Sequence, residues 1–163
     1  MEPFFNPMES LNLDLDILLR DGVAIVAAFI LALPIAWERG YGKRHNGFRT
    51  LPIVAMAACG IALILRPITE GHPDADARVI QGVITGIGFI GGGAILKNGT
   101  SVYGLATAAS IWNAGAIGLA TGMGRFNIAL VLALINLISL LFLRRLDSAD
   151  PDKLPKKDED RED

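Results

Sequence analysis

Five long stretches of this 163-residue chain contain no Asp, Glu, Lys or Arg. They lie at residues 22–37, 50–65, 79–96, 105–122 and 126–143, and each is 16 to 18 residues long. At a rise of about 1.5 Å per residue, a helix of this length with its flanks crosses a hydrocarbon core of about 30 Å. The stretches therefore predict an all-α integral membrane protein, a bundle of about five transmembrane helices.

Composition agrees with this interpretation. The chain is 52% hydrophobic, only 20% charged and rich in glycine, which is unusual for a soluble domain. The first stretch does not resemble a cleaved signal peptide, because acidic Asp14 and Asp16 precede it and charged Glu38 and Arg39 follow it. We expect it to remain in the mature protein.

The basic residues are distributed unevenly between the two predicted membrane faces. Eleven of the 15 belong to the segment at 39–49, the segment after residue 143, or Lys97. The other face has four, namely Arg20, Arg66, Arg78 and Arg125. Because basic residues favour the cytoplasmic side, the amino terminus is predicted to lie outside and the carboxyl terminus in the cytoplasm.

The predicted organisation has three parts. An external segment at 1–16 precedes a transmembrane domain at 17–146, with helices near 17–37, 50–66, 79–96, 104–122 and 126–143. The remaining residues, 147–163, mix both charges without apolar periodicity, so they predict a disordered cytoplasmic tail.

The third stretch contains many glycines. Gly86, Gly88 and Gly91 match the spacing of a dinucleotide-binding motif, but an uncharged span is the wrong context for such a site. Small residues instead allow close helix packing in lipid. We therefore predict the third helix to be the central one, with these packing positions: Gly82, Gly86, Gly88, Gly92 and Gly93.

Polar residues within the third and fourth stretches form a candidate site. Gln81 and Thr85 share one helix face, and Thr107, Ser110 and Asn113 follow one another at intervals of three. Because polar groups inside a bilayer usually face protein or water, we predict a polar seam between these helices. The seam provides either structural hydrogen bonds or the lining of a solute pathway.

The first predicted loop is flanked by a cluster of polar residues at the cytoplasmic face: Glu38, Arg39, Arg49 and Thr50. Glu38 and Arg49 come from helices that end and begin at the same face. Two interpretations remain open, an ion pair between them or contact of Arg49 with lipid phosphates.

The second predicted loop is acidic. Glu70, His72, Asp74 and Asp76 lie within seven residues, which is a weak indication of a divalent-cation site. A solvated loop in which Asp74 or Asp76 caps the third helix is the preferred interpretation. The one cysteine, Cys59, is expected to be a small apolar filler. No arrangement of nucleophile and base is visible, so neither enzymatic activity nor a cofactor is expected.

Three segments resemble the membrane domain of the MgtC/SapB family. They are A-W-E-R-G with N-G-F-R-T at 36–50, the glycine-rich segment with its G-x-G-F-x-G-x-G core at 78–96, and the segment containing T-A-A-S-I-W at 102–124. The resemblance covers much of residues 17–143. We expect this chain to be the membrane domain alone, without the soluble carboxyl-terminal domain of longer members.

The resemblance implies a multi-pass protein of the bacterial inner membrane, in a family linked to growth under low magnesium and to survival inside host cells. It also implies action by protein contact, restraining the proton-driven ATP synthase, rather than magnesium transport. The expected partners are the lipid bilayer, a second copy of the chain and such a membrane complex, and nucleic acid is not expected. The alternative function is a small oligomeric transporter or channel for a cation or similar solute.

Overall fold

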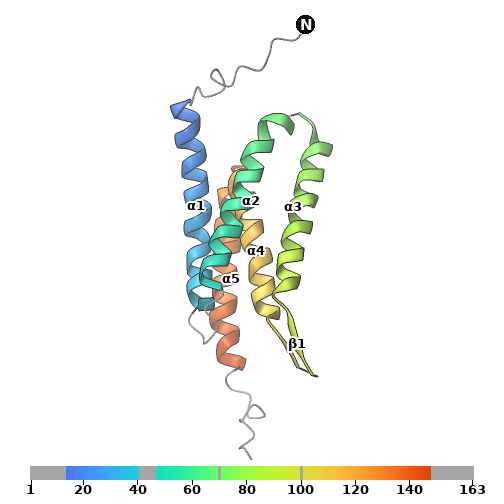
Figure 1. Ribbon diagram of the computed structural model, residues 1–163. Coiled ribbons are helices and arrows are strands. Elements are labelled where there is room, and N and C mark those ends of the chain that lie inside the picture. Colours follow the sequence, from blue (N-terminus) through green and yellow to red (C-terminus); the bar gives the residue numbers. More distant parts are fainter. Residues whose placement is uncertain (1–13, 41–46, 70, 100, 148–163) are drawn as a thin grey trace, which may run out of the picture.

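The computed structural model describes residues 14–40, 47–69, 71–99 and 101–147, and these residues are almost entirely helical. The helices lie side by side in an elongated bundle, with a small hairpin projecting at one end (Figure 1). The elements are α1 (Leu15–Gly40), α2 (Gly47–Thr69), α3 (Pro73–Gly93), β1 (Leu96–Asn98), β2 (Ser101–Tyr103), α4 (Leu105–Gly122) and α5 (Phe126–Asp147).

The prediction of five helices is confirmed. Two of them are long and apolar enough to cross a membrane, namely α1 over Leu15–Gly40 and α2 over Phe48–Ile68. Each has a mean hydropathy of 2.1. The first helix begins where Asp14 accepts hydrogen bonds from the backbone N–H groups of Asp16 and Ile17 at 3.0 and 3.4 Å. Most of the predicted terminal segments, residues 1–13 and 148–163, lie outside the described residues.

The central helix is α4, and the prediction that the third helix is central is wrong. Helix α4 contacts each of the other four helices, whereas α3 lies at one side against α4 and α2. The reason is the distribution of small residues along α4. Gly115, Gly118 and Gly122 are all buried there and leave space for neighbouring helices on its surface.

The contact between α4 and α2 is close enough to exclude side chains. A Cβ atom at Gly118 would overlap the carbonyl oxygen of Ala55, and one at Gly122 would lie 2.6 Å from the carbonyl oxygen of Cys59. Cys59 itself is fully buried, as expected of a small filler. Helix α1 packs in the same way, through a buried row of alanines spaced four residues apart: Ala24, Ala28, Ala32 and Ala36.

Large apolar side chains lie on the outside of the bundle. Phe89 of α3 is 85% exposed, and Val23, Ile64 and Phe142 of three other helices are each more than 60% exposed. Soluble monomers rarely expose so much apolar surface, because its contact with water is unfavourable. Small residues inside and large apolar residues outside indicate a protein surrounded by lipid.

The structure departs from the predicted helix boundaries between the third and fourth helices. The third span was predicted to continue through Leu96, but α3 ends at Gly93 and an antiparallel hairpin follows. Leu96 pairs with Tyr103, and Asn98 pairs with Ser101. Gly99 and Gly104 have φ angles of 59° and 88°, in the left-handed region that glycine adopts most readily.

Candidate functional site

Helix α3 contacts the bundle along one narrow face. Val83, Ile87 and Gly91 follow one another at intervals of four residues and are its buried positions. Ile87 fills the space above Gly115, where a Cβ atom would overlap its side chain, and Gly91 lies against the backbone of Ala108. Ile80 is half-buried and packs against the core beside them, whereas α3 is otherwise mostly exposed.

Gln81 and Thr85 lie on the opposite, exposed face of α3. The Thr85 hydroxyl donates a hydrogen bond of 2.7 Å to the backbone carbonyl oxygen of Gln81 on its own helix. Such a bond satisfies the hydroxyl locally and requires no neighbouring helix.

The polar residues of α4 do not face Gln81 or Thr85. Buried Ser110 donates to the carbonyl oxygen of Ala106 at 2.9 Å, and the Asn113 amide donates to the carbonyl oxygen of Leu132 on α5 at 3.4 Å. Thr107 is half-buried near the start of α4. The predicted seam between the third and fourth helices is therefore wrong, because its two halves point in different directions.

The glycines predicted to pack are open in this chain. No atom of a neighbouring element lies within 4 Å of a Cβ built at Gly82, Gly86, Gly88, Gly92 or Gly93. Within α3 and α4, the glycines that do pack are Gly91 on α3 and Gly115, Gly118 and Gly122 on α4. The spacing of three and four residues in α4 is a signal that the same small-residue argument would have found.

The residues predicted at the cytoplasmic face lie together at one end of the bundle, where α1 ends and α2 begins. The Arg39 Nε atom lies 3.8 Å from the Glu38 Oε2 atom, and both side chains are mostly buried. Thr50 is half-buried in the first turns of α2, whereas Arg49 is exposed. An edge-to-face contact of Trp37 with Phe48, centroids 6.1 Å apart, joins the two helices here.

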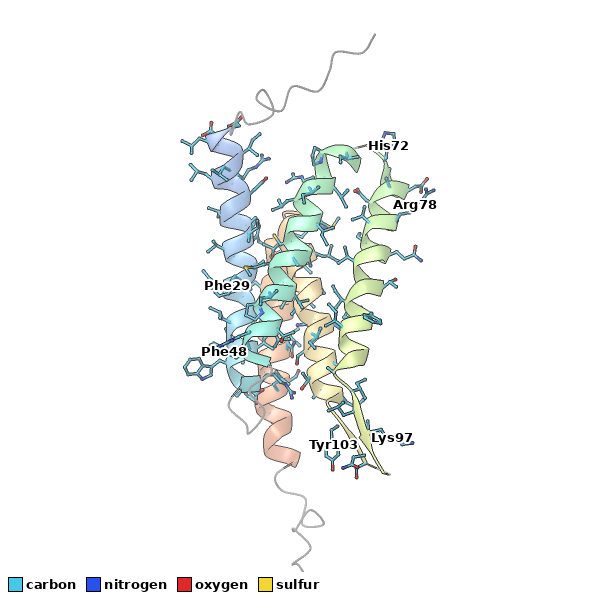
Figure 2. The ribbon with its side chains drawn as sticks, in the orientation of Figure 1. Phe29, Phe48, His72, Arg78, Lys97 and Tyr103 are labelled. Carbon is cyan, nitrogen blue, oxygen red and sulfur yellow. The ribbon has the colours of Figure 1, made fainter. Side chains whose placement is uncertain are left out.

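The acidic loop lies at the opposite end of the bundle, where Figure 2 shows His72 and Arg78. His72 is the N-cap of α3 and Pro73 follows it, so the prediction that Asp74 or Asp76 caps this helix is wrong. Both aspartates lie inside the first turn, where their charge favours the positive end of the helix dipole. Glu70 lies outside the described residues, and the described part of the chain has no group of three metal-ligating side chains.

Comparison with known proteins identifies the family. The profile of the MgtC family matches residues 25–149, which include α2 to α5 and most of α1. This chain belongs to the MgtC family. The matched region contains the exposed face of α3 and the glycines of α4, so both features belong to the part of the chain that the family shares.

Named relatives come from distant bacteria. Protein MgtC of Salmonella typhimurium strain 14028s is 38% identical over 120 residues, which are 74% of this chain and 51% of the relative. Protein MgtC of Brucella abortus is 34% identical over 114 residues, 70% of this chain and 47% of the relative. Protein SapB of Bacillus subtilis is 33% identical over 154 residues, 90% of this chain and 65% of the relative.

The chain spans about half the length of the MgtC relatives that it matches. No solved structure matches it. The family membership and the two long apolar helices together indicate a membrane protein.

Proposed function

We propose that this chain is a multi-pass protein of the bacterial inner membrane that regulates another membrane protein by helix contact during magnesium limitation. By family resemblance, the proton-driven ATP synthase is the leading candidate for that partner. The proposed orientation places the amino terminus outside and the carboxyl terminus in the cytoplasm. The proposed contact takes place within the bilayer.

The observation that carries the proposal is the outward face of α3, which we call the α3 docking face: Gln81, Thr85, Gly88 and Gly92. All four residues are exposed, and the two glycines leave open space where a side chain would be. The Thr85 hydroxyl is satisfied within its own helix, but an amide such as that of Gln81 is unfavourable in hydrocarbon, and intramembrane polar groups usually face protein or water. A partner helix lying along Gly88 and Gly92 would approach closely enough to bond the Gln81 amide.

The alternative function is transport of a cation or similar solute. It required a polar route between α3 and α4, and the residues predicted to line that route do not come together. Gln81 and Thr85 do not meet Ser110 and Asn113 around an opening, and Ser110 bonds to its own helix. Transport would therefore need an oligomer that assembles a different pathway. One such oligomer would have a second copy of the chain bound to the α3 docking face. The capture and flux experiments described next also detect this arrangement.

The test combines partner capture with a flux measurement. The tagged chain, solubilised from native membranes under magnesium limitation, is expected to retain a membrane complex, and Gln81→Leu and Gly88→Leu are each expected to reduce that capture about tenfold or more. Ile30→Ala, at an exposed position on α1 on the other side of the bundle from α3, serves as the control and is expected to retain capture.

The parallel measurement is divalent-cation flux in liposomes that contain the purified chain. We expect no flux above that of empty liposomes. Flux that Asn113→Ala abolishes would replace regulation by transport as the function. Capture that survives both substitutions on the α3 docking face would remove this face from the mechanism.

A further inference from the structure

A pocket lies between α2, α3 and α4, at the end of the bundle where the acidic loop lies. Its volume is about 270 Å³. Ala62 of α2 and Leu119 of α4 line it, and both are buried residues of the core. Ile80 of α3 and Met123, which directly follows α4, also belong to its lining. The pocket is therefore an opening into one end of the core, and apolar side chains provide most of its walls.

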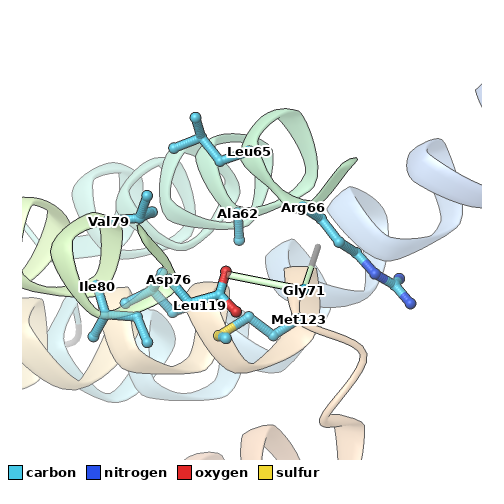
Figure 3. Close-up of a pocket in the computed structure, with 9 residues that line it drawn as sticks. All are labelled: Ala62, Leu65, Arg66, Gly71, Asp76, Val79, Ile80, Leu119 and Met123. Atoms are coloured by element: carbon cyan, nitrogen blue, oxygen red, sulfur yellow. The ribbon is translucent and has the colours of Figure 1, made fainter. Parts of the chain in front are cut away.

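One carboxylate, that of Asp76, is directed into this pocket. Figure 3 shows it turned into the space beside Gly71. Asp76 precedes Ile80 by four residues and Val83 by seven, so these three side chains share the face of α3 that meets the core. A charged side chain therefore occupies a position where the helix period places an apolar one, and such an exception indicates a functional residue.

The Asp76 carboxylate is not neutralised by the protein groups around it. Among the described side chains, no ion pair or hydrogen bond involves Asp76. Arg66 is the one cation in the described lining, and Figure 3 shows its guanidinium extending away from the pocket. Arg78, two residues further along α3, lines a different space, the groove between α2 and α3. Because burial of an unpaired charge is unfavourable, the half-buried carboxylate favours a cationic ligand.

The ends of the surrounding helices have the same preference. Helices α2 and α4 end beside the pocket, at Thr69 and Gly122, so the negative ends of two helix dipoles lie there. Helix α3 begins at this end, but its positive end is offset by two aspartates in its first turn, Asp74 and Asp76. Both the carboxylate and the helix ends therefore favour positive charge in the pocket.

The lining favours an organic cation over a metal ion. Divalent cations take several oxygen ligands, but the described lining has one carboxylate, and the described part of the chain has no group of three metal-ligating side chains. An ammonium group can donate to a single carboxylate, and apolar walls accommodate methylene groups. The volume is below the range of about 300–1,000 Å³ for pockets that bind drug-sized molecules, so the ligand is small. The phosphate of an ethanolamine lipid would find no described cation turned into the pocket, which favours a free amine.

We propose that this pocket binds a small primary amine with a short aliphatic chain. The ammonium group donates a hydrogen bond to Asp76, and the methylene groups lie against Ala62, Ile80 and Leu119. The site goes beyond the proposed function and requires no regulated partner. Because three helices form the pocket, a bound amine connects α3 to α2 and α4 at this end of the bundle.

Isothermal titration calorimetry of the full chain, in detergent and buffer without amines, tests this proposal with n-butylamine as the probe. We expect n-butylamine to bind at least about tenfold more tightly than 1-butanol, which has the same chain but no charge, because it makes a charge-assisted hydrogen bond. Asp76→Asn is expected to remove this difference. Asp74→Asn is the matched control, since it removes the same charge from the same turn of α3 at an exposed position outside the pocket lining, and it should keep the difference.

The apolar walls are tested with a shorter ligand. Methylamine has three methylene groups fewer than n-butylamine and should bind at least about tenfold more weakly, because less apolar surface is buried. Equal affinities of the two amines would remove the walls from the site.

Four further outcomes would overturn the proposal. Equal binding of n-butylamine and 1-butanol by the unmodified chain would remove the ammonium site, and this comparison does not depend on any variant. An unchanged preference in Asp76→Asn, shown to be folded by thermal unfolding, would place the ammonium group elsewhere. Displacement of n-butylamine by Mg²⁺ but not by Na⁺ at equal ionic strength would make this a metal site, and displacement by added phosphatidylethanolamine would make it a lipid-headgroup site.

Discussion

Glycines of this bundle have different roles, depending on whether the backbone of another helix or open space faces them. Gly118 faces the backbone of Ala55 so closely that a Cβ atom would overlap its carbonyl oxygen. Gly88, in an equally glycine-rich helix, faces open space. In a protein surrounded by lipid, burial of apolar surface does not drive helices together, so such close backbone contacts carry much of the packing energy.

This contrast gives a matched pair of substitutions. We predict that Gly118→Ala lowers the free energy of unfolding by about 3 kcal/mol, the upper part of the range for overpacking, because α2 and α4 must separate. Gly88→Ala should be neutral or stabilising by up to about 1 kcal/mol, since alanine restricts the unfolded chain and nothing opposes its methyl group. Unfolding of both variants in mixed detergent micelles measures the difference, and equal stabilities would show that α4 does not pack as described.

The contrast between Gly118 and Gly88 also shows what residue patterns predict, namely the helices, and what they leave open, namely the packing faces. Stretches without charge located all five helices, because an uncharged run of 16 to 18 residues is typical of a helix long enough to cross a hydrocarbon core. The packing faces could not be located in this way, because α3 and α4 are both rich in small residues. Periodicity groups small residues on a helix face but does not say which face packs against a neighbouring helix. Gln81 and Thr85 were placed on one face correctly, but which neighbour that face meets depends on the position of α4.

At the scale of elements, the pattern of uncharged residues did not predict the connection between α3 and α4. Apolar Ala94, Ile95 and Leu96 extend the uncharged stretch beyond Gly93, so the end of the helix is not visible from charge. The signal was Gly99, which directly follows the paired Asn98 at the tip of the hairpin, where glycine favours a tight turn. The hairpin holds the ends of α3 and α4 together, and its last glycine, Gly104, directly precedes α4.

Gly104 is the position where this connection is most sensitive to substitution. Its φ angle is 88°, and a Cβ atom there would overlap the carbonyl oxygen of Ala94. We predict that Gly104→Ala destabilises the protein by at least about 2 kcal/mol, from the cost of a left-handed residue plus the contact. Gly124→Ala is the control, since its φ angle is 75° but nothing lies within 4 Å, so it should show the backbone cost alone. Unfolding measurements that give equal losses would contradict the contact.

At the scale of the whole molecule, the charges divide between the two ends of the bundle. Alternation of the helices places the acidic loop with Arg66 and Arg78 at one end, and the end of α1, the start of α2 and the hairpin with Lys97 at the other (Figures 1 and 2). The structure thus separates Arg66 and Arg78 from Arg39, Arg49 and Lys97, as the sequence pattern assumed, while six of the fifteen basic residues lie outside the described part of the chain. The orientation itself follows from the positive-inside bias, which predicts the end with Arg39, Arg49 and Lys97 to be cytoplasmic.

Single-cysteine labelling tests this orientation with the chain in its own membrane. Cys59 is the one cysteine and is fully buried, so Cys59→Ala gives a background in which Asp74→Cys or Asn98→Cys, both at exposed positions, is the only thiol. A membrane-impermeant maleimide added to intact spheroplasts should label Asp74→Cys, whereas Asn98→Cys should react only after the membrane is opened. The reverse pattern would invert the topology. Labelling of both positions in intact cells would mean that α3 does not cross the membrane, because its two ends would then share one side.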